Sequence, residues 1–278
     1  GFEAMLSYGH RWGDFSWDSS FTFSANKNEI VELVKDYVHP ETGKTYNVDK
    51  LELKTDEGRG FGKAKFILKE GGTLGDLYTH ADLKRDINGN ILIDDSGNVT
   101  AIDNAGDIKL GSVLPKANLA WNNSFSYKGI NAGFLLTARL GGIVYSATQA
   151  YLDLYGVSET SAAARDAGGV WVNGRSRVNP QSFYEVVASQ SGLPTYYTYS
   201  ATNLRLQEAH IGYTIPRRWL GNVCDINVSL VGRNLWMIYC KAPFDPEAVA
   251  TTNNYYQGID YFMMPSTRNI GFNIKINF

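Results

Sequence analysis

The last residues of the chain, RNIGFNIKINF (268–278), alternate strictly between apolar and polar side chains. The apolar positions are Ile270, Phe272, Ile274, Ile276 and Phe278. A period of two predicts a β-strand with one apolar and one polar face. Such a strand fits a soluble sandwich, whose apolar face meets a second sheet, and an outer-membrane barrel, whose apolar face meets lipid.

The same alternation recurs along the chain and predicts about ten strands. The segment FSWDSSFTFSAN places aromatic residues on one face and Ser, Thr and Asp on the other, as a wet barrel interior requires. The predicted strands lie within 1–8, 15–26, 63–70, 73–84, 117–127, 130–140, 205–215, 225–239 and 268–278. Two further segments, SATQAYLDLYG and SETSAAARDAG, fit short helices within a loop.

The predicted connections alternate between short and long, which favours a barrel over a sandwich. Short connections fall near 9–14, 70–73, 128–129 and 216–224, and long ones near 27–62, 84–116, 141–198 and 238–267. Outer-membrane barrels have short periplasmic turns and long extracellular loops, and their strands need about ten residues to cross the bilayer at a tilt. Aromatic residues at the predicted strand ends fit an interfacial girdle: Tyr8, Phe15, Trp17, Tyr127, Trp219, Trp236 and Tyr239.

Composition excludes some classes of protein. A net charge of −2 over 278 residues gives no basic footprint for nucleic acid. No run of 18 apolar residues predicts a transmembrane helix, which a barrel does not need. Cys224 and Cys240 are predicted to be free, since a strand between them would hold them too far apart to bridge. The chain opens with alternation and no signal peptide, so we expect a mature chain or a fragment that starts within a fold.

Several blocks resemble the C-terminal part of SusC/RagA-type TonB-dependent outer-membrane transporters of Bacteroidetes. The most specific are NLRLQEAHIGYTIPRRWL, VSLVGRNLWMIYCKAPFDPE and NYYQGIDYFMMPSTRNIGFNIKINF. FSWDSSFTFSANKNEI, KFILKEGGTLGDLY and GDIKLGSVLPKANLAWNNSFSYKG extend the resemblance over nearly the whole chain. It is weakest in the loops at 27–60 and 141–195.

The resemblance implies an all-β, antiparallel transmembrane barrel. Residues 1–278 would supply about ten C-terminal strands of a 22-stranded plugged barrel, with the plug and the N-terminal strands absent. The implied function is outer-membrane import of a glycan or oligopeptide in nutrient uptake, beneath a SusD-like surface lipoprotein lid. TonB–ExbB–ExbD would act through the missing N-terminal part, and no catalytic residues are expected. Phe278 would be the terminal aromatic residue that the barrel-assembly machinery recognises, or one more lipid-facing side chain.

Binding residues are expected among the loop aromatics, which suit sugar stacking or contact with the lid and equally suit packing within the loops. The candidates are Tyr151, Tyr155, Trp171, Tyr196, Tyr197, Tyr255 and Tyr256. Asp18, Arg205, Glu208 and Lys275 are expected to line the lumen, where they would hydrate the interface with the plug.

Two further hypotheses concern chemistry. A self-closed ten-stranded outer-membrane protease would need a His–Asp pair at the rim, from His80 with Asp76 or Asp82, or from His39 with Asp36. The stretch DINGNILIDD resembles a calcium loop in the wrong register, so a hairpin turn at Asn88-Gly89 is favoured over a site made by Asp86, Asn88 and Asp94. No cofactor other than this calcium ion is expected.

Overall fold

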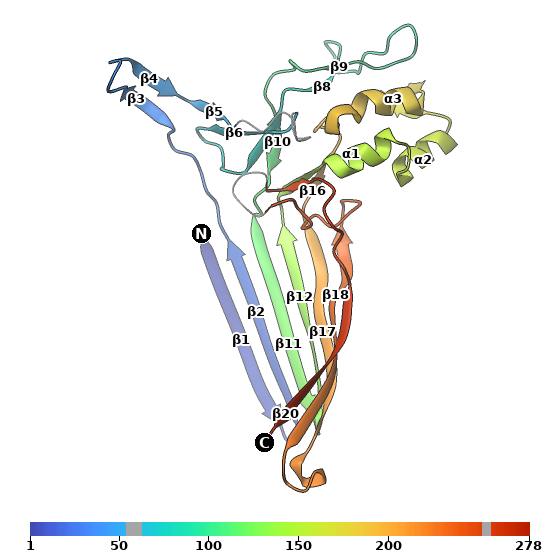
Figure 1. The fold of residues 1–278 in the computed structure, drawn as a ribbon. Coiled ribbons are helices and arrows are strands. Elements are labelled where there is room, and N and C mark those ends of the chain that lie inside the picture. The colour runs from blue at the N-terminus through green and yellow to red at the C-terminus, as the bar shows by residue number, and fades with distance from the viewer. Residues whose placement is uncertain (54–62, 252–256) are drawn as a thin grey trace.

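A long, curved antiparallel sheet dominates the computed structural model, which describes residues 1–53, 63–251 and 257–278 (Figure 1). Seven strands follow one another in the order β1-β2-β11-β12-β17-β18-β20. Their bounds are β1 (Phe2–Trp12), β2 (Phe15–Ala25), β11 (Ala117–Tyr127), β12 (Ile130–Leu140), β17 (Asn203–Ile215), β18 (Asp225–Cys240) and β20 (Asn269–Asn277). Each strand pairs with its neighbour in sequence, so the sheet is a meander.

The connections alternate in length, as the sequence predicts. Residues 13–14, 128–129 and 216–224 join strands at one end of the sheet, where 217–219 form a single 3-10 turn, η2 (Arg217–Trp219). Residues 26–116, 141–202 and 241–268 join them at the other end, where the described parts of these connections gather into a cap (Figure 1). The cap is therefore built by segments that are far apart in the sequence.

The first connection forms small sheets rather than long strands. It contains β3 (Val34–Val38), β4 (Thr45–Val48), β5 (Lys50–Glu52), β6 (Lys65–Lys69), β7 (Asp76–Thr79), β8 (Asp82–Leu83), β9 (Ala101–Ile102) and β10 (Ile108–Ser112). The order β10-β7-β6-β5 makes a four-stranded sheet, and the β3–β4 hairpin projects away from the rest (Figure 1).

The second connection carries the helices, and the third joins them through a short strand. The second contains β13 (Ile143–Ser146), α1 (Ala147–Leu154), α2 (Glu159–Asp166), β14 (Val170–Val172), β15 (Ser176–Val178), α3 (Pro180–Val187), η1 (Ser189–Ser191) and β16 (Thr198–Ser200). In the third, β19 (Ile259–Asp260) pairs in parallel with β13. The two predicted helices are thus confirmed as α1 and α2. None of the helices in the described part of the chain is long and apolar enough to cross a membrane.

The sheet has an apolar and a polar face, and the apolar face has no cover among the described residues. Register places Leu6 opposite Phe21, Phe21 opposite Trp121 and Trp121 opposite Leu136 on one face. Large side chains there stay exposed, with Leu6 at 71% and Phe272 at 78%. A sandwich would bury this face against a second sheet. The pattern therefore favours lipid as the medium that this face meets.

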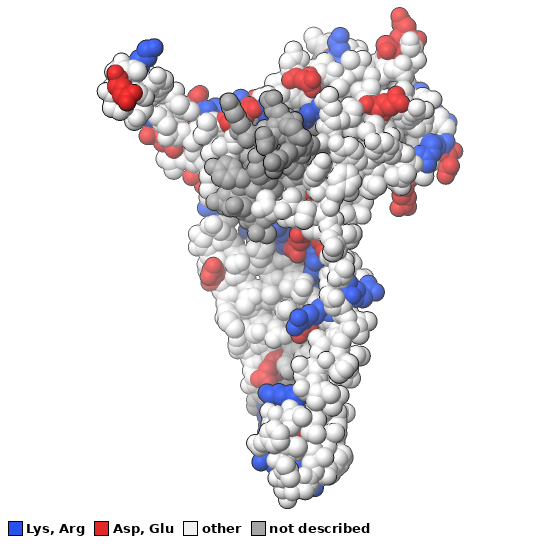
Figure 2. Space-filling view, in the orientation of Figure 1, with Lys and Arg blue, Asp and Glu red and all other residues white. Residues whose placement is uncertain are grey.

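The buried hydrophobic core lies in the cap instead. Its residues come from the three long connections, with Phe66, Leu77, Tyr145, Val187 and Ile259 among the most buried. Charged side chains are scattered over the cap, and others appear along the stem formed by the sheet (Figure 2). The cap thus has a buried hydrophobic core like that of a water-soluble protein, whereas the sheet has none.

The prediction of about ten long strands is wrong in number, although the antiparallel β class is confirmed. Residues 63–70 and 73–84 form β6, β7 and β8, which have two to five residues and lie in the cap. They are too short to cross a bilayer, which needs about 9–11 residues per strand. Phe66 and Ile67 are consecutive and both buried, so protein covers both faces of β6.

The odd strand number also excludes closure of this sheet on itself by antiparallel pairing. Strand direction alternates along a meander, so the first and seventh strands, β1 and β20, run the same way (Figure 1). The self-closed ten-stranded barrel is therefore wrong for the described residues. Both edges present unpaired backbone groups, which need partners in a membrane.

Glycines on the polar face leave room for side chains from neighbouring strands. A Cβ on Gly133 of β12 would lie 2.6 Å from Cε1 of His210 and 2.7 Å from the backbone oxygen of Asn123. The backbone contact cannot move aside as a side-chain tip can. His210 therefore depends on this glycine for its position across β12.

We expect Gly133→Ala to destabilise the sheet by about 1–3 kcal/mol, because overpacking forces backbone shifts. Gly271→Ala is the matched control, since its Cβ would meet nothing within 4 Å on the same face of β20. Urea unfolding of the full-length protein in detergent measures both. Equal stability of the two variants would contradict the packing argument.

Candidate functional site

The polar face of the sheet carries an ordered row of hydrogen-bonding side chains beside the cap. Register pairs Glu3 with Ser24, Ser24 with Asn118, Asn118 with Arg139 and Arg139 with Asn203. These five residues, the rim row, lie side by side across five strands. A second row, one step further from the cap, contains Met5, Thr22, Ala120, Thr137 and Arg205.

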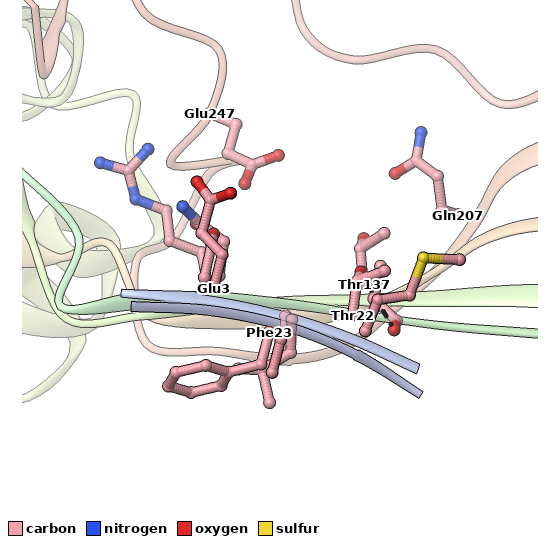
Figure 3. Close-up of a pocket in the computed structure, with 14 residues that line it drawn as sticks. Glu3, Thr22, Phe23, Thr137, Gln207 and Glu247 are labelled. Carbon is pink, nitrogen blue, oxygen red and sulfur yellow. Dashed lines mark hydrogen bonds between the residues drawn. The ribbon is translucent and has the colours of Figure 1, made fainter. Parts of the chain in front are cut away.

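The residues that the two rows take from β1, β2, β11 and β12 form the floor of a cavity of about 750 Å³, here called the wall pocket. Glu3, Ser24, Asn118 and Arg139 of the rim row line it, and Glu247 from the third connection joins them. Glu3, Thr22, Thr137, Gln207 and Glu247 lie on one side of the sheet, whereas Phe23 points away on the other (Figure 3). A further cavity of about 530 Å³ shares Glu3, Ser24 and Asn118 and continues toward the cap.

A nearly buried ion cluster, here called the latch, fixes the third connection to the sheet. The Arg205 Nη2 lies 2.7 Å from Asp245 Oδ1 and 3.1 Å from Glu247 Oε2, and Nη1 donates to Asp245 Oδ2 at 3.1 Å. The side chains of Arg205 and Asp245 are only 5% and 9% exposed. Asn203 Nδ2 donates to Glu247 Oε1 at 3.3 Å. Bidentate pairing satisfies the planar guanidinium and gives the latch a defined geometry.

The latch sets the charge of Asp245. Burial by itself would raise the pKa of this carboxyl, but hydrogen bonds from Arg205 and from the Glu247 backbone N–H outweigh burial and lower it. Asp245 therefore stays ionised at neutral pH. The alternation along the strand predicts that Arg205 faces the lumen, but it does not indicate the partners of Arg205, which lie 40 and 42 residues further along the chain.

The third connection is also tied to the helical part of the cap. Ser146 Oγ donates to Asp260 Oδ2 at 2.5 Å and accepts from the Gln149 backbone N–H, so one hydroxyl both caps α1 and holds β19. The Phe262 backbone N–H donates to Thr148 Oγ1 at 2.7 Å. The third connection thus contacts the sheet wall through Asp245 and the helical part of the cap through Asp260 and Phe262.

The predicted binding aromatics do not form one cluster. Tyr155, at 74% exposed, and Trp171 lie on the cap surface, and the Arg177 guanidinium sits 4.5 Å from the Trp171 ring centroid. Tyr151 packs against Phe262 and Tyr196 against Phe183. Tyr255 and Tyr256 lie outside the described residues. Tyr155 and Trp171 are the members whose rings are largely open to solvent.

Tyr197 belongs to the core of the cap in this structure. Its side chain is 2% exposed, and its hydroxyl donates to Asp153 Oδ2 at 3.0 Å. Burial raises the pKa of Tyr197, and the nearby Asp153 carboxylate raises it further. Asp153 also accepts from Ser158 Oγ and from Gln149 Nε2, so this network joins α1, α2 and the segment before β16.

The favoured interpretation of DINGNILIDD as a turn is confirmed. Asp86 Oδ1 accepts from the backbone N–H groups of Asn88 and Asn90, and the Asn90 side chain donates to Oδ2. These hydrogen bonds lower the pKa of Asp86. Asp94 forms a second turn of the same kind with Ser96 and Asn98. Asp86 and Asp94 thus accept hydrogen bonds in separate turns, and no group of three or more His, Cys, Asp or Glu residues in the described ranges is placed to hold a metal ion.

The histidines proposed for a protease have other partners. His80 Nε2 lies 2.9 Å from Asp107 Oδ1, and Lys50 Nζ donates to both Asp107 oxygens. Asp76 instead bonds to Lys109 and Thr73, and Asp82 to Arg85 and Thr195. His39 Nδ1 accepts from the Glu41 backbone. The predicted pairs of His80 with Asp76 or Asp82 are therefore wrong, and the Asp107 cluster ties β5, β7 and β10 together.

Aromatic rings line the apolar face at the end with the short turns. Trp12 and Phe15 have ring centroids 6.0 Å apart, Trp17 and Phe125 6.5 Å, and Tyr213 and Trp219 6.3 Å. This arrangement is typical of an interfacial girdle. Phe278 follows β20 at this end and is 85% exposed.

Comparison with known proteins confirms the resemblance predicted from the sequence. The chain is 25% identical to TonB-dependent receptor P3 of Formosa agariphila, over 94% of this chain and 27% of that protein. It is 24% identical to TonB-dependent receptor P39 of the same organism, over 95% of this chain and 28% of that protein. The chain thus spans little more than a quarter of the length of these relatives. No family model matches it.

Solved structures share the fold. The RagAB peptide importer in the "closed-closed" state aligns with 99% of this chain and 29% of its own chain, with a TM-score of 0.64 and 17% sequence identity. A second structure of the RagAB peptide transporter gives a TM-score of 0.62 and 16% identity. At this identity the comparison establishes the fold alone.

We expect Asp245→Asn to loosen the third connection, because Arg205 loses its bidentate partner at a cost of about 3 kcal/mol. Cys240 reports this loosening, since its thiol faces the carbonyls of Ala242 and Phe244. Maleimide labelling of Cys240, in a Cys224→Ser background, should accelerate at least about tenfold. Glu208→Gln is the control, because Glu208 pairs with Arg233 elsewhere on the same face. Equal labelling in both variants would contradict the latch.

The lowered pKa of Asp245 predicts how the latch responds to acid. A carboxyl whose pKa is depressed in the folded state stabilises that state at pH values above its ordinary pKa of 3.8. This stabilisation is lost as the pH falls through the depressed pKa. Cys240 protection should therefore stay constant from pH 7 to about pH 5 and decrease only below pH 3.8. Loss of protection near pH 6 would mean that a different group controls the connection.

Proposed function

We propose that this chain forms the C-terminal part of the barrel of a TonB-dependent importer in the bacterial outer membrane. The observation that carries the proposal is the seven-stranded meander, with a bare apolar face, a polar opposite face and all long connections at one end. Its similarity to TonB-dependent receptors over 94% of its length supports the same conclusion.

The remaining polypeptide would complete the barrel. An open sheet cannot remain in lipid, because unpaired backbone groups there cost several kcal/mol each. Strands outside this chain would pair with β1 and β20, and the polar face would line the lumen around a plug. Asp18, Glu208, Arg205 and Lys275 come from strands whose polar side chains share this face. Phe278 would serve as the terminal residue that the assembly machinery recognises.

The cap would face the cell exterior and meet a SusD-like surface lipoprotein. The fold shared with the RagAB peptide importer supports a transporter that works with a partner protein. Tyr155 and Trp171 are the candidate residues best exposed for contact with this lid or with substrate. The substrate would be a glycan or an oligopeptide, moved without chemical change while TonB–ExbB–ExbD acts through the rest of the polypeptide. No cofactor takes part, and calcium bound by Asp86, Asn88 and Asp94 would at most be structural.

Purification from outer membranes tests this proposal. We expect the sequence to occur in a polypeptide of about 100 kDa that co-purifies with a lipoprotein, and deletion of its gene to abolish a TonB-dependent uptake. The relatives' lengths motivate this size, since the chain covers 27% of one and 28% of another. A folded protein of 30.8 kDa without uptake would contradict the proposal.

A further inference from the structure

We propose that the wall pocket binds an oligopeptide of about four residues, extended across the strands, with its amino terminus at Glu3 and its carboxyl terminus at Arg139. This inference rests on the proposed import function, because it names one substrate class and a place where it binds. It concerns four residues of the rim row, which belong neither to the predicted aromatics nor to the latch: Glu3, Ser24, Asn118 and Arg139.

The charges at the two ends of the pocket support a ligand with opposite charges at its own ends. Glu3 and Arg139 are three strands apart in the rim row, about 14 Å at a strand spacing of about 4.8 Å. An extended peptide spans about 3.3–3.6 Å per residue, so about four residues separate its termini by this distance. Glu3 has no ion pair among the described residues.

The middle of the pocket suits a peptide backbone. Ser24 and Asn118 lie between Glu3 and Arg139, and Thr22 and Thr137 lie in the next row. These side chains both donate and accept hydrogen bonds, as peptide N–H and C=O groups require. Phe23 contributes the one aromatic ring named among the lining residues, and it points to the opposite face (Figure 3). The pocket therefore offers no ring surface on which a sugar could stack.

Arg139 has an unused donor at the end assigned to the carboxylate. Its Nη2 donates to the Val113 carbonyl at 2.7 Å, whereas its Nε is buried and has no acceptor among the described residues. A buried donor without an acceptor is costly, and a turn of the Arg139 side chain toward the pocket would let a ligand carboxylate satisfy it with a charge-assisted bond. Glu247 lies nearby, but Arg205 and Asn203 already hold its carboxylate.

Calorimetry on the full-length protein in detergent tests this assignment with tetra-alanine, its N-acetylated form and its C-amidated form. We expect each blocked peptide to bind about tenfold more weakly than tetra-alanine. Glu3→Gln should remove the difference in affinity between the free and N-acetylated peptides. Arg139→Gln should remove the difference in affinity between the free and C-amidated peptides. Each combination of a protein substitution with a blocked peptide forms a thermodynamic cycle, which isolates the contact at one end of the peptide. Glu208→Gln, on the same face but outside the pocket, should preserve both differences.

Three results would overturn the assignment: equal binding of free and blocked peptides, blocking effects that persist in Glu3→Gln, or no binding of tetra-alanine by folded protein. The Glu3 comparison stands by itself if Arg139→Gln does not fold.

Measurements of uptake separate this inference from the import proposal. TonB-dependent uptake of a neutral oligosaccharide, with no peptide binding, would overturn the peptide site and leave import intact. Absence of any uptake that depends on the gene would overturn import itself.

Discussion

The bare apolar face of the seven-stranded sheet is the constraint on which the rest of the structure depends. Hydrophobic burial is the main favourable term in folding in water, and a sheet that exposes Leu6, Phe272 and their neighbours forgoes it there. Such a sheet is stable only where the surrounding medium is itself apolar. In lipid every backbone group must also be paired, so the free edges of β1 and β20 are the places where other strands would attach.

The cap follows the opposite rule, since it folds around a buried core as a water-soluble domain does. Its core brings together residues as distant in sequence as Phe66 and Ile259. Because the cap grows from three separate connections, it holds the ends of the strands at fixed positions. The Arg205–Asp245 pair joins the sheet wall to the third connection, and the Ser146–Asp260 contact joins that connection to the helical part of the cap.

The rim is where the two environments meet, and the polar chemistry concentrates there. Glu3, Ser24, Asn118, Arg139 and Asn203 come from five strands, yet the register places them in one row. None of these residues is unusual by itself. Their joint position beneath Glu247 creates a pocket with a charge at each end, which no single segment of the sequence indicates.

The sequence by itself determined the long strands, their two faces and the alternation of short and long connections, because these features depend on a local period of two and on local turn residues. It also determined α1, α2 and the turn at Asn88-Gly89, where side chains bond to the neighbouring backbone. Only the tertiary structure decided that 63–84 belongs to the cap, because a five-residue strand alternates like a longer one until both of its faces are buried. It likewise decided the partners of Arg205 and His80 and the burial of Tyr197, since each depends on contacts between segments at least 27 residues apart. Local patterns specify which way a side chain faces, whereas its neighbour across the fold is fixed by packing that forms only when distant segments meet.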